Sequence, residues 1–176
     1  MFRYTRSQVV LVGILLLTYI LTGVVATLYQ VVCVEVADNI TFLSPDFSEL
    51  LTHNFVQINK NMILGILSLC LYSFSMLFSN SFAGGICVGY FIQAKNMSAF
   101  FTGFLPHAIF EIPAVLLSVG VPIIFYGIIF GSIRQKKSIF KYFLKEIKTK
   151  LVSVILLSYL LIIIAAIFES YISYFK

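Results

Sequence analysis

Long uncharged apolar segments alternate with short polar segments along this chain of 176 residues. Residues 7–34 contain no charged side chain and exceed the roughly 20 apolar residues that cross a membrane as a helix. Residues 61–94 are also uncharged, and as one helix they would measure about 51 Å, which is too long for a single crossing. Two further apolar segments follow at residues 106–133 and 151–172. The pattern predicts an all-α, multi-pass transmembrane helical bundle of about five spans.

The limits of the expected spans come from the residues that break these segments. The runs 79–81 (Ser-Asn-Ser) and 84–85 (Gly-Gly) are the strongest turn formers in the second uncharged segment, so we expect its turn around Asn80. The third span either extends towards Phe101 or is partly re-entrant, because it would be too short if it ended at Gln93. The expected spans are residues 8–30, 61–79, 82–101, 106–133 and 151–172.

Residues 35–60 form the one sizeable polar loop, with four acidic residues against a single lysine. Ser44 and Pro45 are typical of a helix start, with serine as the N-cap and proline at the first helical position. We expect an amphipathic helix that lies at the membrane interface and runs into the second span. Its apolar residues recur at helical spacing: Phe47, Leu50, Leu51, Phe55, Ile58 and Met62.

The distribution of positive charge predicts the orientation in the membrane. Seven of the 12 lysines and arginines lie in the loop 134–150, and two precede the first span. Because cytoplasmic loops carry an excess of Lys and Arg, we expect the N-terminus and this basic loop inside. With five spans, the loop 35–60 and the C-terminus are then extracytoplasmic, and residues 1–176 form a single integral domain of the cell membrane.

Composition supports this class and excludes others. Sixty per cent of the residues are hydrophobic and 11% are charged, whereas soluble domains carry about 25% charged residues. The mean hydropathy is +1.02. The basic loop is short, lies next to the membrane and contains apolar residues, so we expect contact with anionic lipid and no binding of nucleic acid. The three cysteines lack metal-ligand spacing and are expected to act as small hydrophobic residues.

Ionisable residues inside the expected spans are the candidates for function, because they are unfavourable in lipid. His107 and Glu111 are four residues apart and share one face of the fourth helix. Glu169 lies in the fifth span at a similar expected depth in the outer leaflet. Asn54, beside His53, belongs to the same side of the membrane. We expect His107, Glu111, Glu169 and Asn54 to form one buried polar cluster.

Several residues in these segments have a structural interpretation. Pro106 suits the first helical turn, whereas Pro113 lies further along the helix and cannot donate a backbone hydrogen bond. Gly84, Gly85 and Gly89 permit close approach of another helix, although a Gly-x-x-x-Gly spacing alone is a weak signal.

No catalytic constellation is evident. The chain has two histidines, and neither belongs to the His-Glu-x-x-His pattern of a metalloprotease. We therefore expect no enzymatic activity, no metal site and no cofactor. The polar cluster remains open to two interpretations: a hydrogen-bonded group that fixes helix packing, or a site for a partner or ligand. A proton relay between the two carboxylates and the histidine is also open.

The segment 105–114, Leu-Pro-His-Ala-Ile-Phe-Glu-Ile-Pro-Ala, resembles the Leu-Pro-His-Gly-Ile-Phe-Glu-Leu-Pro-Ala signature of the stage II sporulation protein M family. Ala108 stands where the family usually has glycine. Further pieces match in order at residues 50–54, at Gly65, and in the Asn-Gly-rich stretch of Asn80, Gly84 and Gly89. The segment 165–169, Ala-Ala-Ile-Phe-Glu, is similar to the family's C-terminal ending. The resemblance covers residues 50–172.

The resemblance implies a multi-pass membrane protein without established enzymatic activity. Sporulation members of the family work in a complex for engulfment and thinning of the septal wall, in which partner proteins degrade peptidoglycan. Shorter relatives occur with circular bacteriocins and are linked to maturation, export or immunity. The expected partners are therefore the lipid bilayer and other membrane proteins, either a peptidoglycan-remodelling complex or an ABC transporter that handles a hydrophobic peptide.

Overall fold

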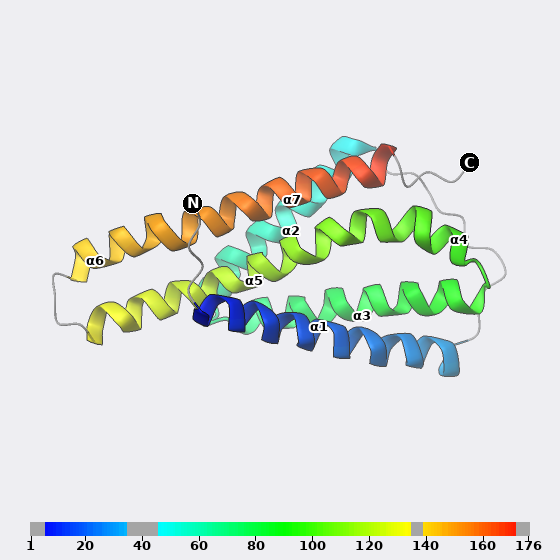
Figure 1. Cartoon of the computed structure of the whole chain (residues 1–176), viewed down its shortest axis with the longest axis horizontal. Coiled ribbons are helices and arrows are strands. Elements are labelled where there is room, and N and C mark those ends of the chain that lie inside the picture. The colour runs from blue at the N-terminus through cyan, green and yellow to red at the C-terminus, as the bar shows by residue number, and fades with distance from the viewer. Residues whose placement is uncertain (1–5, 35–45, 135–138, 172–176) are drawn as a thin grey trace.

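The computed structural model describes residues 6–34, 46–134 and 139–171, which are almost entirely helical and contain no β-strand (Figure 1). The described chain is an all-α bundle, as the sequence predicts. Its helices are α1 (Arg6–Cys33), α2 (Phe47–Leu67), α3 (Leu71–Gln93), α4 (Met97–Ala99), α5 (Leu105–Arg134), α6 (Ile139–Glu146) and α7 (Val152–Tyr171). Two π-helical segments, Phe100–Phe104 and Ile147–Leu151, lead into α5 and α7.

Four described segments are long and apolar enough to cross a membrane: Val9–Cys33, Leu71–Gln93, Met97–Ile133 and Phe143–Tyr171. The protein is therefore a membrane protein. The expected second span, residues 61–79, is not among these segments, because it covers the end of α2, a turn and the start of α3.

The turn between α2 and α3 lies at residues 68–70, and the turn expected around Asn80 is wrong. Leu69 and Cys70 have positive φ angles of 54° and 73°, which reverse the chain without glycine. The small residues that suggested a turn serve instead as a packing face of α3. The Ser81 hydroxyl donates to the carbonyl of Tyr19 on α1. Helix α3 is continuous from Leu71 to Gln93, so it gains its length by starting earlier than the expected span and does not extend to Phe101.

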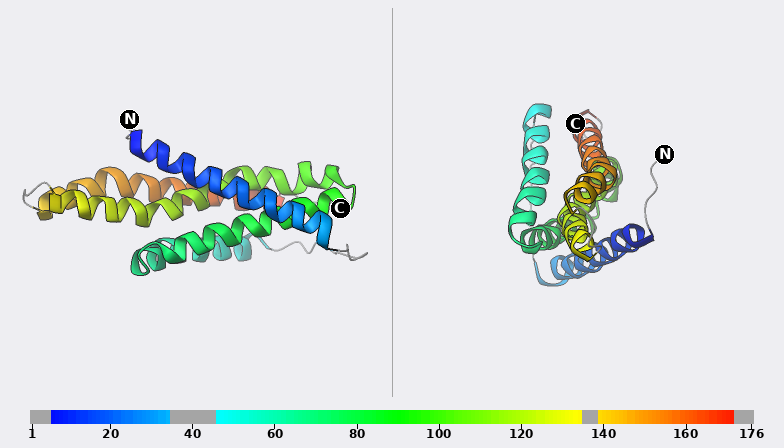
Figure 2. Two further views of the ribbon diagram at one scale, coloured as in Figure 1. Left: turned by 90° about the horizontal axis from the view of Figure 1, so that it is seen from below. Right: turned by 90° about the vertical axis from the view of Figure 1, so that its left-hand side faces the viewer.

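Helix α3 runs in the same direction as α1, crosses it at an angle and packs closely against it (Figures 1 and 2). A Cβ atom on Gly85 would lie 2.3 Å from the carbonyl oxygen of Gly23, and one on Gly89 would lie 2.7 Å from Cβ of Gln30. These two glycines therefore set the approach of the helices. Gly84 has more room, since its added Cβ would lie 3.6 Å from the Tyr19 hydroxyl.

Helix α2 packs one face against α5 and α7. Ile58 and Met62 belong to a buried core that also contains Val121 of α5 and Val154 of α7. Asn61 is fully buried, and its amide donates to the Ser118 hydroxyl of α5 at 3.1 Å. The polar residues that made α2 resemble an interfacial helix are thus partly used for contacts with other helices.

Helix α5 is the centre of the bundle and contacts α1, α2, α3 and α7. It continues through Pro113 and Pro122 as one helix. Together with α6 it extends past the turn between α2 and α3 (Figures 1 and 2). Tyr126 marks the level of that turn, because its hydroxyl donates to the carbonyl of Ile66.

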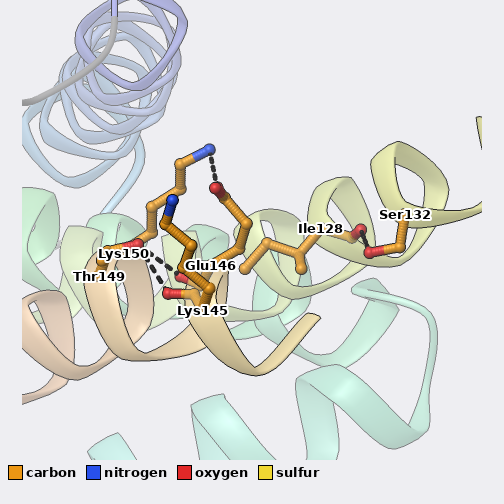
Figure 3. Close-up of polar contacts among 6 residues, drawn as sticks. All are labelled: Ile128, Ser132, Lys145, Glu146, Thr149 and Lys150. Carbon is orange, nitrogen blue, oxygen red and sulfur yellow. Dashed lines mark hydrogen bonds and ion pairs between the residues drawn. The ribbon is translucent and has the colours of Figure 1, made fainter. Parts of the chain in front are cut away.

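The expected basic loop 134–150 is largely helical where it is described. Figure 3 shows its polar contacts: Lys150 pairs with Glu146, and the Thr149 hydroxyl donates to the carbonyl of Lys145 at 2.9 Å. Phe143 packs edge-on against Phe125 of α5, with ring centroids 5.9 Å apart. The apolar residues between the lysines thus form a helix that docks on α5, which explains why this segment is not a loop.

Candidate functional site: an ionisable junction between the helices

His107 and Glu111 stand one above the other near the start of α5. Nδ1 of His107 lies 3.0 Å from the carbonyl oxygen of Gly103. Because a carbonyl oxygen accepts, Nδ1 carries the proton in this contact. The Phe104 ring packs edge-on against the imidazole, with centroids 5.4 Å apart. The residues before α5 therefore fix the position of His107.

The Glu111 carboxyl interacts electrostatically with His107, with Glu169 of α7 and with His53 of α2. The rings of Phe110 and Phe168 lie 5.0 Å apart, one residue before each glutamate, and hold the two helices in this register. Three expected members of the cluster, His107, Glu111 and Glu169, thus lie in one region of the bundle.

The same carboxyl interacts electrostatically with Tyr19 of α1 and with Cys87 of α3. Glu111 therefore interacts with an ionisable side chain from each of α1, α2, α3 and α7. We call this group the junction: Tyr19, His53, Cys87, His107, Glu111 and Glu169. Tyr19 and Cys87 were not among the expected members of the cluster, because the periodicity of an almost wholly apolar helix does not reveal which of its faces turns towards α5.

Asn54 is buried, with 6% of its surface exposed, but no contact among the described residues joins it to Glu111. Its neighbour His53 supplies the electrostatic contact from α2. This part of α2 therefore approaches the cluster as expected, but the side chain that interacts with Glu111 is His53 and not Asn54.

Polar contacts connect the helices further from Glu111. The amide of Gln57 donates to the side-chain oxygen of Asn80 at 2.7 Å. The hydroxyl of Tyr159 donates to the side-chain oxygen of Asn59 at 2.7 Å. Asn80, expected in a turn, therefore links α3 to α2.

The chemistry of the junction follows from its groups. Two carboxyl groups and two imidazoles are groups that can bind and release protons, and opposite charges among them stabilise each other in a low-dielectric interior. Within the described ranges, no three His, Cys, Asp or Glu residues lie close enough to hold a metal ion. Nor does any direct hydrogen bond or ion pair join Glu111 to another described side chain. The arrangement suits proton binding and helix packing better than nucleophilic attack.

Comparison with known proteins identifies the family. Residues 9–174 match the family model described as Stage II sporulation protein M. The chain belongs to this family. No curated protein and no solved structure matches it.

The family match begins at residue 9 and thus includes nearly all of α1, which lies outside the resemblance to stage II sporulation protein M seen in residues 50–172. Tyr19 of α1 interacts with Glu111, which lies in the signature segment of the family. The first helix therefore belongs to the same structural unit as the signature.

Proposed function

We propose that this protein is a non-catalytic member of a membrane complex that remodels the cell envelope, in the manner of the sporulation members of its family. One observation supports the proposal most: the family-like segments of α5 and α7 meet around Glu111, together with His53 of α2. Among the described side chains no hydrogen bond or ion pair ties Glu111 to a single partner, and a junction shared in this way by several helices suits a packing and assembly role.

We further propose that the N-terminus is cytoplasmic and the C-terminus extracytoplasmic. The excess of lysine and arginine in residues 134–150 supports this orientation. The junction then lies in the outer half of the membrane. Contacts with partners that act on the cell wall would start from that side.

The test is isolation of the complex from the protein's own host. The tagged chain is extracted in mild detergent, its partners are identified by mass spectrometry, and release of soluble fragments from peptidoglycan is measured. We expect a peptidoglycan hydrolase among the partners and hydrolysis by the complex. The purified chain alone should release nothing above a detergent blank.

A variant pair connects the test to the junction. Glu111→Leu should lower the recovery of the partner, whereas Ile109→Leu, at an exposed position on the same helix, should not. Hydrolysis by the purified chain alone would contradict the proposal. Recovery of an ABC transporter with a small hydrophobic peptide would instead support the alternative role in export, maturation or immunity.

A further inference from the structure

Helix α2 lies at one edge of the bundle (Figure 2). Its outward face exposes both apolar and charged side chains. A shallow groove of about 700 Å³ runs along this face. Val56 and Ile63, which are 45% and 57% exposed, flank Lys60, which is also exposed. We call Val56, Lys60, Ile63 and Leu64 the outer stripe of α2.

Lys60 lies at the depth of the membrane-spanning helices. Asn61, the next residue, is fully buried and bonded to Ser118 of α5. Helix α2 continues for seven more residues to Leu67, about 10 Å of helix. The turn beyond it exposes apolar residues, with Leu69 at 72% and Leu71 at 73%. Lys60 is therefore not at a polar boundary of the bundle.

An ammonium group at this depth needs a partner. Ionisable residues within membrane-spanning bundles almost always face the interior, a water-filled cavity or an opposite charge. Among the described residues, no carboxylate lies within ion-pair distance of Lys60. If lipid tails covered the outer stripe, no opposite charge would compensate the ammonium group of Lys60. The isolated chain therefore lacks a partner for this group.

A second copy of this chain would not supply the opposite charge that Lys60 needs. In a two-fold pair the same patch faces itself, so Lys60 would approach the other Lys60. Like charges repel strongly in a low-dielectric setting. A helix with apolar side chains and a carboxylate at this depth matches both the shape and the charge of the outer stripe.

We infer that the outer stripe of α2 binds a transmembrane helix of a partner protein that carries an aspartate or glutamate at the depth of Lys60. The inference rests on the proposed membership in a complex and assigns the surface that makes the contact. It also explains why α2, alone among the long helices, carries a lysine on an exposed face in its interior.

Photo-crosslinking in membranes of the protein's own host tests this inference. Benzoylphenylalanine replaces Ile63 on the outer stripe, and Leu17, an exposed residue of α1, as the control. We expect a protein adduct at position 63, with the crosslinked peptide in a partner's membrane span that contains Asp or Glu. At position 17 we expect lipid adducts.

The charge of Lys60 provides the second readout. Lys60→Met and Lys60→Glu should each lower the yield of the adduct about tenfold, equivalent to about 1.4 kcal/mol. Lys60→Arg should retain it. Since Lys60→Met only removes a charge from an exposed position, it remains informative if Lys60→Glu does not fold. Changing the partner's acid to lysine should restore the adduct with Lys60→Glu.

Three results overturn the inference: lipid adducts alone at position 63, an adduct with a second copy of this chain, or a partner peptide without an acidic residue. If these occur while the partner still co-purifies, the role in a complex stands and the outer stripe is the wrong surface. If no partner is recovered at all, the proposed function fails as well.

Discussion

Glu111 is the residue that interacts with the most ionisable side chains of the junction. Its carboxyl interacts favourably with His107 and His53 and unfavourably with Glu169. Removing the charge of Glu169 relieves that repulsion. The consequence of losing Glu111 therefore depends on whether Glu169 is present.

A double-mutant cycle measures this dependence. Glu111→Gln should destabilise the protein more in the Glu169→Gln background than in the wild type, because only favourable interactions remain to be lost. We expect a coupling of about 0.5–3 kcal/mol in unfolding free energy, measured in detergent micelles. The control combines Glu111→Gln with Glu146→Gln at the opposite end of the bundle, where the effects should add. Additive effects in the first pair would contradict the junction.

Gly85 is the second residue with a specific expected effect. A Cβ at this position would meet a backbone oxygen, which cannot move without shifting α1. Gly85→Ala should lower the free energy of unfolding by about 1–3 kcal/mol, the range for overpacking. Gly120→Ala is the matched control, because no atom lies within 4 Å of the added Cβ. Equal thermal stability of the two variants would show that α1 and α3 are not in close contact here.

At the scale of the elements, the position of the turn before α3 differs most from the sequence-based expectation. The small polar residues of α3 are compatible with both a turn and a helix, and local sequence gives no means of choosing. What decides is the packing of α1 against Gly85 and Ser81, a contact between segments about 60 residues apart. The observed turn lies at residues 68–70, within the sequence Leu-Ser-Leu-Cys-Leu of residues 67–71. This sequence contains no glycine or proline, so it does not indicate a turn.

A proline substitution tests this assignment. Ser79→Pro in the middle of α3 should cost about 3 kcal/mol or more, because it removes a backbone donor and clashes with the preceding turn. Met97→Pro, at the first position of α4, should be tolerated, because that amide needs no helical partner. The measurement is the folded yield and melting temperature in detergent. Tolerance of Ser79→Pro would restore the turn near Asn80.

Helix α2 shows the other limit of sequence reasoning. The sequence correctly predicted a helix here, with its apolar face at Ile58 and Met62. The helix begins at Phe47 with Asp46 as its N-cap, and not at Pro45 after Ser44. The sequence did not predict the polar contacts of this helix with α3, α5 and α7. Asn61, Gln57 and Asn59 bond to other helices, and no pattern along a single helix distinguishes such contacts from exposure to water. The spacing of His107 and Glu111, in contrast, predicted a shared face directly.

At the scale of the whole molecule, α1, α3 and α7 run in one direction and α2 and α5 in the other (Figure 1). The long helices α2, α3 and α5 alternate in direction between the acidic loop and the basic segment, so this part of the chain begins and ends at opposite ends of the bundle, as the proposed orientation requires. A reporter that is active only outside the cytoplasm should be active when fused after Lys176 and inactive when fused at Ser138. The reverse pattern would overturn the orientation and the proposed outer position of the junction.

The central claim is that α5 and α7 are in the register that brings Glu111 and Glu169 to one depth. Cross-linking tests it in a chain whose three native cysteines are replaced by alanine. With cysteines at positions 110 and 168, whose rings pack 5.0 Å apart, a short bifunctional thiol reagent should join the helices efficiently. Cysteines at the exposed positions 109 and 167, one residue earlier on each helix, should react far less with each other. Efficient cross-linking of the pair 109 and 167, with none between 110 and 168, would contradict the claim.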